Sequence, residues 1–233
     1  MAGKNVEKMP KKENLTSVDK VSNFVSANRV VLLSTICVVI LGLVGYTIFL
    51  HFSQMNVEKD LAQIENIEFL FTKDAAGASE DVLKDKYDSA LKNLEKYTSK
   101  GGIAGARASY LSAEIKFLQK DYSAAKDFYI AAASKVNKTY LSSICCYCAG
   151  VCFEELNDTD KALEYYENSA NDKNFPDTTH ALFNAGRIKE SKLDYTGAKE
   201  AYEKITAKNN PNDPWSNAAQ SRILQMQIDG KIE

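Results

Sequence analysis

The stretch DYSAAKDFY (residues 121–129) decides the fold, because variants of it recur as DTDKALEYY (158–166) and DYTGAKEAY (194–202). Its central alanines, Ala125, Ala162 and Ala198, are 37 and 36 residues apart. A small residue stands twelve positions before each alanine and a tyrosine four positions after it: Ala113, Gly150 and Gly186, and Tyr129, Tyr166 and Tyr202. Small residues let two helices approach closely, and an aromatic ring fills the remaining gap. The pattern therefore predicts stacked pairs of helices, A and B.

The recurring unit resembles the tetratricopeptide repeat, whose period is about 34 residues. Apolar spacing and breakers predict helices at about 103–119, 122–135, 138–156, 159–171, 177–191, 195–208 and 214–228, preceded by one with Leu83 and Tyr97 on one side. The first repeat is weak, since Leu94 replaces the tyrosine. We expect an all-α chain with a tetratricopeptide repeat-like α-solenoid of about three and a half repeats and a helical cap.

A charge-free apolar run, residues 30–50, precedes the repeats. As a helix it is about 30 Å long, which matches the hydrocarbon thickness of a bilayer. A cleaved signal peptide is the competing interpretation, but the run is too long and has no small-residue cleavage site after it. The predicted organisation is a cytoplasmic basic tail (1–28), a single transmembrane helix (29–52), a juxtamembrane helix and linker (53–78), and the repeat domain with its capping helix (79–233).

The charges around the apolar run indicate its orientation. The first 29 residues hold six basic and three acidic residues, whereas residues 51–233 hold 23 basic and 28 acidic residues. Because lysine and arginine near a span stay in the cytoplasm, the tail is expected inside and the repeats outside. The acidic balance and the lack of a basic stripe argue against nucleic acid as a partner.

The layout resembles the ancillary subunit of the bacterial Sec translocon, a membrane-anchored, tetratricopeptide-like family. The resemblance lies in the basic tail, the span, the GARASYLSAE helix (105–114) and the terminal LQMQI (224–228). It implies a single-pass protein of the bacterial cytoplasmic (inner) membrane with a periplasmic C-terminal domain. Its implied partners are translocon components, exported polypeptides and periplasmic chaperones, and the family offers no catalytic residues.

Catalysis finds little support in the sequence. Cys145, Cys148 and Cys152 fall on one helical face at inward positions of the repeat, where free cysteine acts as a small apolar filler. A zinc site would need a second pair of ligands. We therefore expect no metal, no cofactor, no catalytic residue and no small-molecule substrate. A thiol-redox protein that uses the Cys145–Cys152 cluster remains an alternative.

Equivalent positions of the A helices suggest a groove for protein partners. A helices line the concave side of such solenoids, and their fifth positions are Tyr110, Tyr147 and Phe183. The second and ninth positions add five more candidates: Arg107, Glu114, Val151, His180 and Arg187. Aromatic area flanked by charge suits the binding of a peptide. The alternative is that the aromatic rings only pack against the neighbouring A helix.

These inferences predict a membrane-anchored, non-catalytic scaffold for protein–protein interactions at the export face of the cytoplasmic membrane. An organelle outer-membrane tetratricopeptide receptor with its repeats in the cytosol has the same layout and remains a second alternative.

Overall fold

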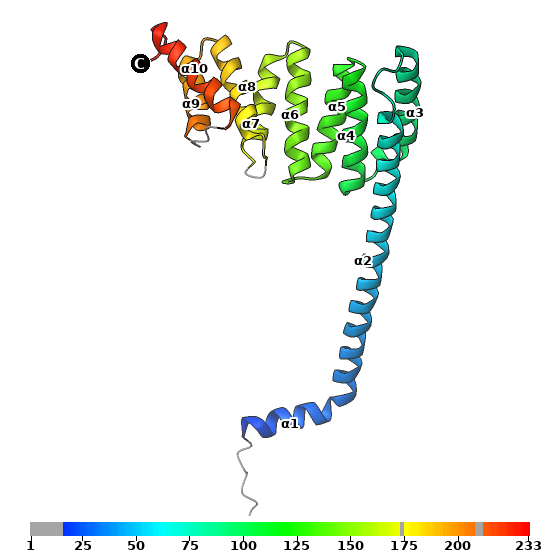
Figure 1. The fold of residues 1–233 in the computed structure, drawn as a ribbon. Coiled ribbons are helices and arrows are strands. Elements are labelled where there is room, and N and C mark those ends of the chain that lie inside the picture. Colours follow the sequence, from blue (N-terminus) through cyan, green and yellow to red (C-terminus); the bar gives the residue numbers. More distant parts are fainter. Residues whose placement is uncertain (1–15, 173–174, 208–211) are drawn as a thin grey trace, which may run out of the picture. The chain divides into compact units, whose positions relative to one another are not determined.

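The computed structural model describes residues 16–172, 175–207 and 212–233 of the chain. These residues form α-helices and no strand (Figure 1), which confirms the all-α prediction. The helices are α1 (Ser17–Ala27), α2 (Arg29–Thr72), α3 (Glu80–Thr98), α4 (Gly102–Leu118), α5 (Tyr122–Lys135), α6 (Tyr140–Glu155), α7 (Thr159–Ala170), α8 (Thr178–Ser191), α9 (Tyr195–Thr206) and α10 (Pro214–Ile228). The helices expected between residues 103 and 228 are present, whereas most of the predicted basic tail (1–15) lies outside the described residues.

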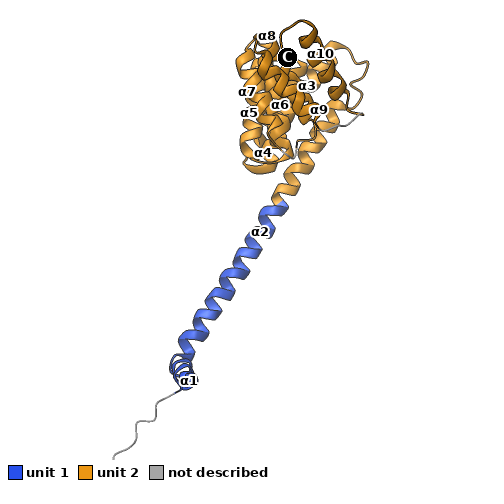
Figure 2. Cartoon of the chain, turned by 90° about the vertical axis from the view of Figure 1, so that its left-hand side faces the viewer, with its two compact units in different colours: residues 1–55 blue, residues 56–233 orange. Residues whose placement is uncertain are grey.

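The chain divides into two compact units, Met1–Met55 and Asn56–Glu233 (Figure 2). In the first unit, Thr16 and Asp19 cap the start of α1: each backbone N–H donates to the other residue's side chain, at 3.0 and 3.3 Å. Helix α1 ends at Ala27 and is capped by Asn28, whose backbone N–H donates to the Phe24 carbonyl oxygen at 3.0 Å. The chain then turns sharply into α2 (Figure 1).

Helix α2 is long and apolar enough to cross a membrane, judged by its length and composition. Except for the half-buried Leu32, its large apolar side chains between Val30 and Phe52 are exposed, which is the expected state of a surface that meets lipid. The hydroxyls of Thr35 and Thr47 donate to the carbonyl oxygens of Val31 and Val44, both at 2.8 Å. The helix thus satisfies these polar atoms without water, as a lipid environment requires.

The second unit is a stack of helix pairs. Helices α4 and α5, α6 and α7, and α8 and α9 pack as A–B pairs, and α10 packs on α9 and α8 as a cap. The alanines Ala125, Ala162 and Ala198 have no exposed surface, and the tyrosines Tyr129, Tyr166 and Tyr202 are at most 3 % exposed. The predicted register of small residues and aromatic rings is therefore confirmed.

Each of these pairs closes through the same three-residue turn. The middle residue has a left-handed backbone, with φ of 60° at Lys120, 62° at Asn157 and 65° at Leu193. The aspartate that follows caps the B helix: Asp121, Asp158 and Asp194 accept from the backbone N–H three residues ahead at 3.2, 3.1 and 2.9 Å. This capping explains why every repeat motif in the sequence begins with aspartate.

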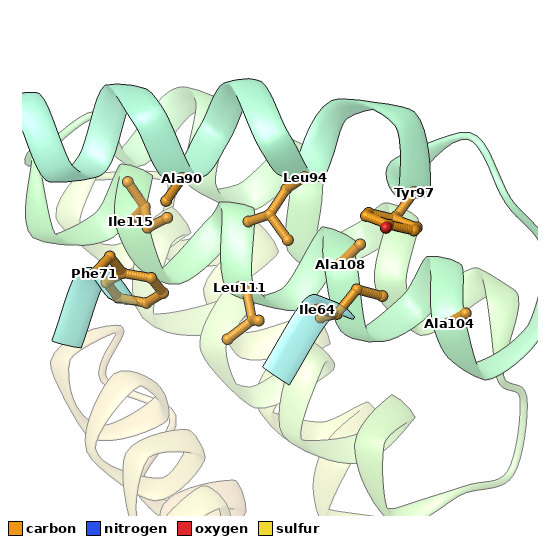
Figure 3. Packing of buried hydrophobic residues seen from close by; sticks show 9 residues of the cluster. All are labelled: Ile64, Phe71, Ala90, Leu94, Tyr97, Ala104, Ala108, Leu111 and Ile115. Carbon is orange, nitrogen blue, oxygen red and sulfur yellow. The ribbon is translucent and has the colours of Figure 1, made fainter. Parts of the chain in front are cut away.

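The N-terminal end of the solenoid is built differently, because side chains from the last part of α2 pack on α3 and α4 there. Ile64 and Phe71 of α2 are buried in one cluster with Ala90, Leu94 and Tyr97 of α3 and with Ala104, Ala108, Leu111 and Ile115 of α4 (Figure 3). The repeat register did not indicate this role, because Ala78, twelve positions before Ala90, lies in the linker between α2 and α3. The C-terminal part of α2 therefore belongs to the packed core of the solenoid.

The close approach of A and B helices gives a first prediction. A Cβ added at Gly186 would lie 2.5 Å from a ring carbon of Tyr202, whereas one at Gly150 would lie 3.0 Å from the ring of Tyr166. We expect Gly186→Ala to lower the free energy of unfolding by about 2 kcal/mol and Gly150→Ala to lower it less. Urea unfolding of the full chain in detergent measures both, and equal stability of Gly186→Ala and wild type would contradict the packing.

The left-handed turns give a second prediction. Leu193 is 70 % exposed and gains little from burial, so its positive φ is a net cost. Asparagine, which the second repeat has at Asn157, tolerates this backbone. We expect Leu193→Asn to raise the free energy of unfolding by about 0.5 kcal/mol. Leu224→Asn, at an exposed site inside α10, is the matched control and should lower it through helix propensity.

Candidate partner-binding surface

The eight candidate groove residues lie on consecutive A helices. Arg107, Tyr110 and Glu114 are on α4, Tyr147 and Val151 on α6, and His180, Phe183 and Arg187 on α8. Arg187 is exposed and the other seven are half-buried. The structure gathers them into two groups, one between α2, α4 and α6 and one between α6, α8 and α10.

The group on α4 combines one cation with two carboxylates. Arg107 Nη2 donates to Glu68 Oε2 of α2 at 2.6 Å, and its guanidinium lies 5.5 Å from the ring centre of Tyr110. The Tyr110 hydroxyl donates to Glu114 Oε1 at 2.7 Å. Burial raises the pKa of Glu114, and the charge of Glu68 adds to the shift, although Tyr110 and Arg107 oppose it. The Glu114 carboxylate is therefore poorly solvated and incompletely neutralised.

A pocket of about 560 Å³ opens beside this group. Glu68 and Phe71 of α2, Glu114, Phe117 and Leu118 of α4, and Val151 of α6 line it, together with residues of α5 and α6. Two of the eight predicted residues, Glu114 and Val151, thus share a pocket with residues that the repeat register did not single out. Phe71 was missed because its helix precedes the recognisable repeats.

The second group is filled by side chains of the chain itself. The Tyr147 hydroxyl lies 2.9 Å from Nδ1 of His180 and accepts from Nδ2 of Asn184 at 3.2 Å. The imidazole of His180 stacks on the indole of Trp215, with ring centres 3.8 Å apart and planes 12° apart. Phe183 also packs against Trp215, at 5.1 Å between ring centres. The capping helix α10 therefore covers the aromatic positions of α8.

An acid–arginine bridge repeats along this half of the solenoid. Glu154 of α6 accepts from the hydroxyl of Tyr166 at 3.0 Å and from Nη2 of Arg187 at 2.7 Å. One repeat later, Glu190 accepts from the hydroxyl of Tyr202 at 3.2 Å and pairs with Arg222 of α10. We call each set a Tyr–Glu–Arg bridge. Glu154 joins the B helix α7 to the A helix α8, and Glu190 joins the B helix α9 to the capping helix α10.

The cysteines are arranged as packing residues. Cys145 and Cys152 are buried and Cys148 is half-buried, and all three are free thiols. Burial raises the pKa of Cys148 and Cys152 to about 12 and that of Cys145 as well, so the thiols stay protonated at neutral pH. The described residues contain no cluster of three or more histidine, cysteine or acidic side chains placed to hold a metal ion.

The sequence of this chain is similar to that of a protein with tetratricopeptide repeats. No family model matches the chain. The chain is similar to a TPR repeat-containing protein of Treponema pallidum (strain Nichols), with 29 % identity over 151 residues, which are 64 % of this chain and 63 % of that protein. The chain thus spans less than two thirds of the relative's length.

The helix pairs, their register and this similarity together identify a tetratricopeptide repeat-like α-solenoid that follows one long apolar helix. Such repeats are used for protein interactions. Whether the eight candidate residues bind a partner stays a prediction.

The stacked His180 and Trp215 rings give a third prediction. Burial lowers the pKa of His180 below its ordinary value of 6.5; the charge of Arg187 adds to this and that of Asp177 opposes it. The folded state thus favours the neutral imidazole of His180. The stability that this preference gives the folded state is complete above pH 6.5 and is lost as the pH falls towards the folded-state pKa.

We expect the free energy of unfolding to fall between pH 7 and pH 5, and His180→Gln to weaken this dependence. Trp215 is the only tryptophan of the chain, so its fluorescence reports the local environment and the unfolding transition. The other histidine, His51, provides the control His51→Gln. An unchanged pH dependence in His180→Gln would assign the effect to other groups.

Proposed function

We propose that this protein is a single-pass, membrane-anchored scaffold that recruits protein partners through its repeat domain. The observation that carries the proposal is the composition of α2. Its first part exposes an apolar surface without acidic or basic residues, and its last part holds Ile64 and Phe71 in a core shared with α3 and α4. One helix thus combines a lipid-compatible segment with a structural part of the binding domain.

The properties of α1 support anchoring. Val18, Val21, Phe24 and Val25 are exposed and fall on one side of the helix, whereas Asp19, Lys20 and Asn23 fall on the other. Such a helix suits the interface between headgroups and acyl chains. Figure 1 shows that the chain turns between α1 and α2, as expected where a surface helix meets a crossing helix. The basic tail then favours the cytoplasmic side.

The class of protein partners depends on which side of the membrane the repeat domain lies. With the repeats outside the cytoplasm, the resemblance to the ancillary translocon subunit favours translocon components, exported polypeptides and periplasmic chaperones as partners. With the repeats in the cytosol of a cell with organelles, the same fold would serve as an outer-membrane receptor. The excess of basic residues before α2 favours the first arrangement.

Protease accessibility is the fourth prediction and tests the anchored orientation. In intact spheroplasts carrying the full chain with a tag at each end, added protease should remove the C-terminal tag and leave the N-terminal tag. Detergent-lysed spheroplasts are the control, in which both tags should be lost. Protection of the C-terminal tag in intact spheroplasts would place the repeats in the cytosol and contradict the proposed location.

A further inference from the structure

The A helices differ in the side chain at the register position that Arg187, the arginine of the first Tyr–Glu–Arg bridge, occupies on α8. In the repeat register, Arg187 of α8 corresponds to Val151 of α6 and to Glu114 of α4, at spacings of 36 and 37 residues. The bridge glutamates Glu154 and Glu190 correspond to Phe117 of α4. The first junction between complete repeats therefore lacks both charged members of the Tyr–Glu–Arg bridge.

The pocket lies at this junction. Phe117 and Val151, which replace the glutamate and the arginine, both line it, and Phe71 and Leu118 extend its apolar wall. Its volume of about 560 Å³ is within the range of ligand-binding pockets, roughly 300–1,000 Å³. Where later repeats close the junction with a salt bridge, this one leaves an apolar space.

The rim of the pocket has an excess of negative charge. Glu68 and Glu114 both line the pocket, and they face one guanidinium, that of Arg107, which is already paired with Glu68 at 2.6 Å. Glu114 occupies the position at which α8 has an arginine. Within the described part of the chain, its carboxylate accepts a hydrogen bond from one side chain, the neutral hydroxyl of Tyr110. A carboxylate that is half-buried in this way is stabilised by an added cation.

We propose that this pocket binds a polypeptide segment in which an apolar side chain is adjacent to a lysine or arginine. The apolar side chain enters the space between Phe117, Leu118 and Val151, and the cation pairs with Glu114. The partner thereby supplies the charge that Arg187 and Arg222 supply within the later repeats. This inference rests on the proposed scaffold function and specifies the chemistry of the segment that the scaffold recruits.

The test uses the full chain in phosphatidylcholine nanodiscs and three fluorescently labelled peptides of equal length. The first alternates leucine and lysine, the second leucine and glutamate, and the third serine and lysine; binding to empty nanodiscs is subtracted. We expect the leucine–lysine peptide to bind at least tenfold more tightly than the other two. Glu114→Gln should weaken its binding about tenfold, because it removes one partly buried, charge-assisted interaction.

Two further variants complete this fifth prediction. Glu203→Gln removes one exposed carboxylate of α9 and is the control matched in charge, which should leave the affinity unchanged. Val151→Arg restores the bridge arginine at its register position next to Glu114. We expect it to abolish binding of the leucine–lysine peptide without lowering the melting temperature, which separates loss of the site from loss of the fold.

A photo-crosslinking residue at Leu118, which lines the pocket and is 56 % exposed, shows where each peptide binds. Crosslinking of the leucine–lysine peptide, reduced in Glu114→Gln, supports the proposal. Equal affinity for the three peptides, unchanged affinity in Glu114→Gln, or crosslinking of Leu118 to lipid or to residues 1–15 of the chain itself would overturn it. Preferential crosslinking of the leucine–glutamate peptide would overturn the inference but would leave the proposed scaffold function intact. A repeat domain found in the cytosol by the protease experiment would contradict the proposed location alone.

Discussion

The structure depends on a contact between a glycine or alanine of one helix and a tyrosine ring of the next. At Gly186 the ring of Tyr202 is so near that there is no room for a methyl group, and at Gly150 the ring of Tyr166 leaves little more. This contact sets the separation of the A and B helices, and the separation in turn lets the three-residue turns and their aspartate caps close each pair. The burial of Ala125, Ala162 and Ala198 follows from the same close approach.

The two halves of the solenoid use this common framework differently. Towards the C-terminus, Glu154 and Glu190 tie successive repeats together, and Trp215 covers the aromatic side chains of α8. Towards the N-terminus, apolar residues replace the charged ones and a pocket remains beside two carboxylates. Substitutions at two positions of the repeat register, together with Trp215 of α10 at one end and Glu68 and Phe71 of α2 at the other, distinguish the closed half from the open, negatively charged one.

The sequence was sufficient to predict the helix pairs, because spacing of small and aromatic residues is a local, periodic signal. It was insufficient for the packing of α2 on the solenoid, since the linker between α2 and α3 breaks the period and leaves Ile64 and Phe71 without a register. Periodicity also identified the A-helix positions of the candidate site. The partners that fill those positions, such as Trp215 on His180 and Glu154 on Arg187, come from other repeats, and their side-chain contacts depend on how the stack packs.

The location of Ile64 and Phe71 determines which proteolytic fragments of this protein keep an intact core. A cut in the linker after Thr72 would release a repeat domain without α2. The apolar surface of Ala90, Leu94 and Tyr97 that Ile64 and Phe71 cover would then be exposed to water. Such a fragment would attract chaperones or degradation. A cut ahead of Asn56 would leave that apolar surface covered by Ile64 and Phe71, so the released repeat domain would keep its core intact.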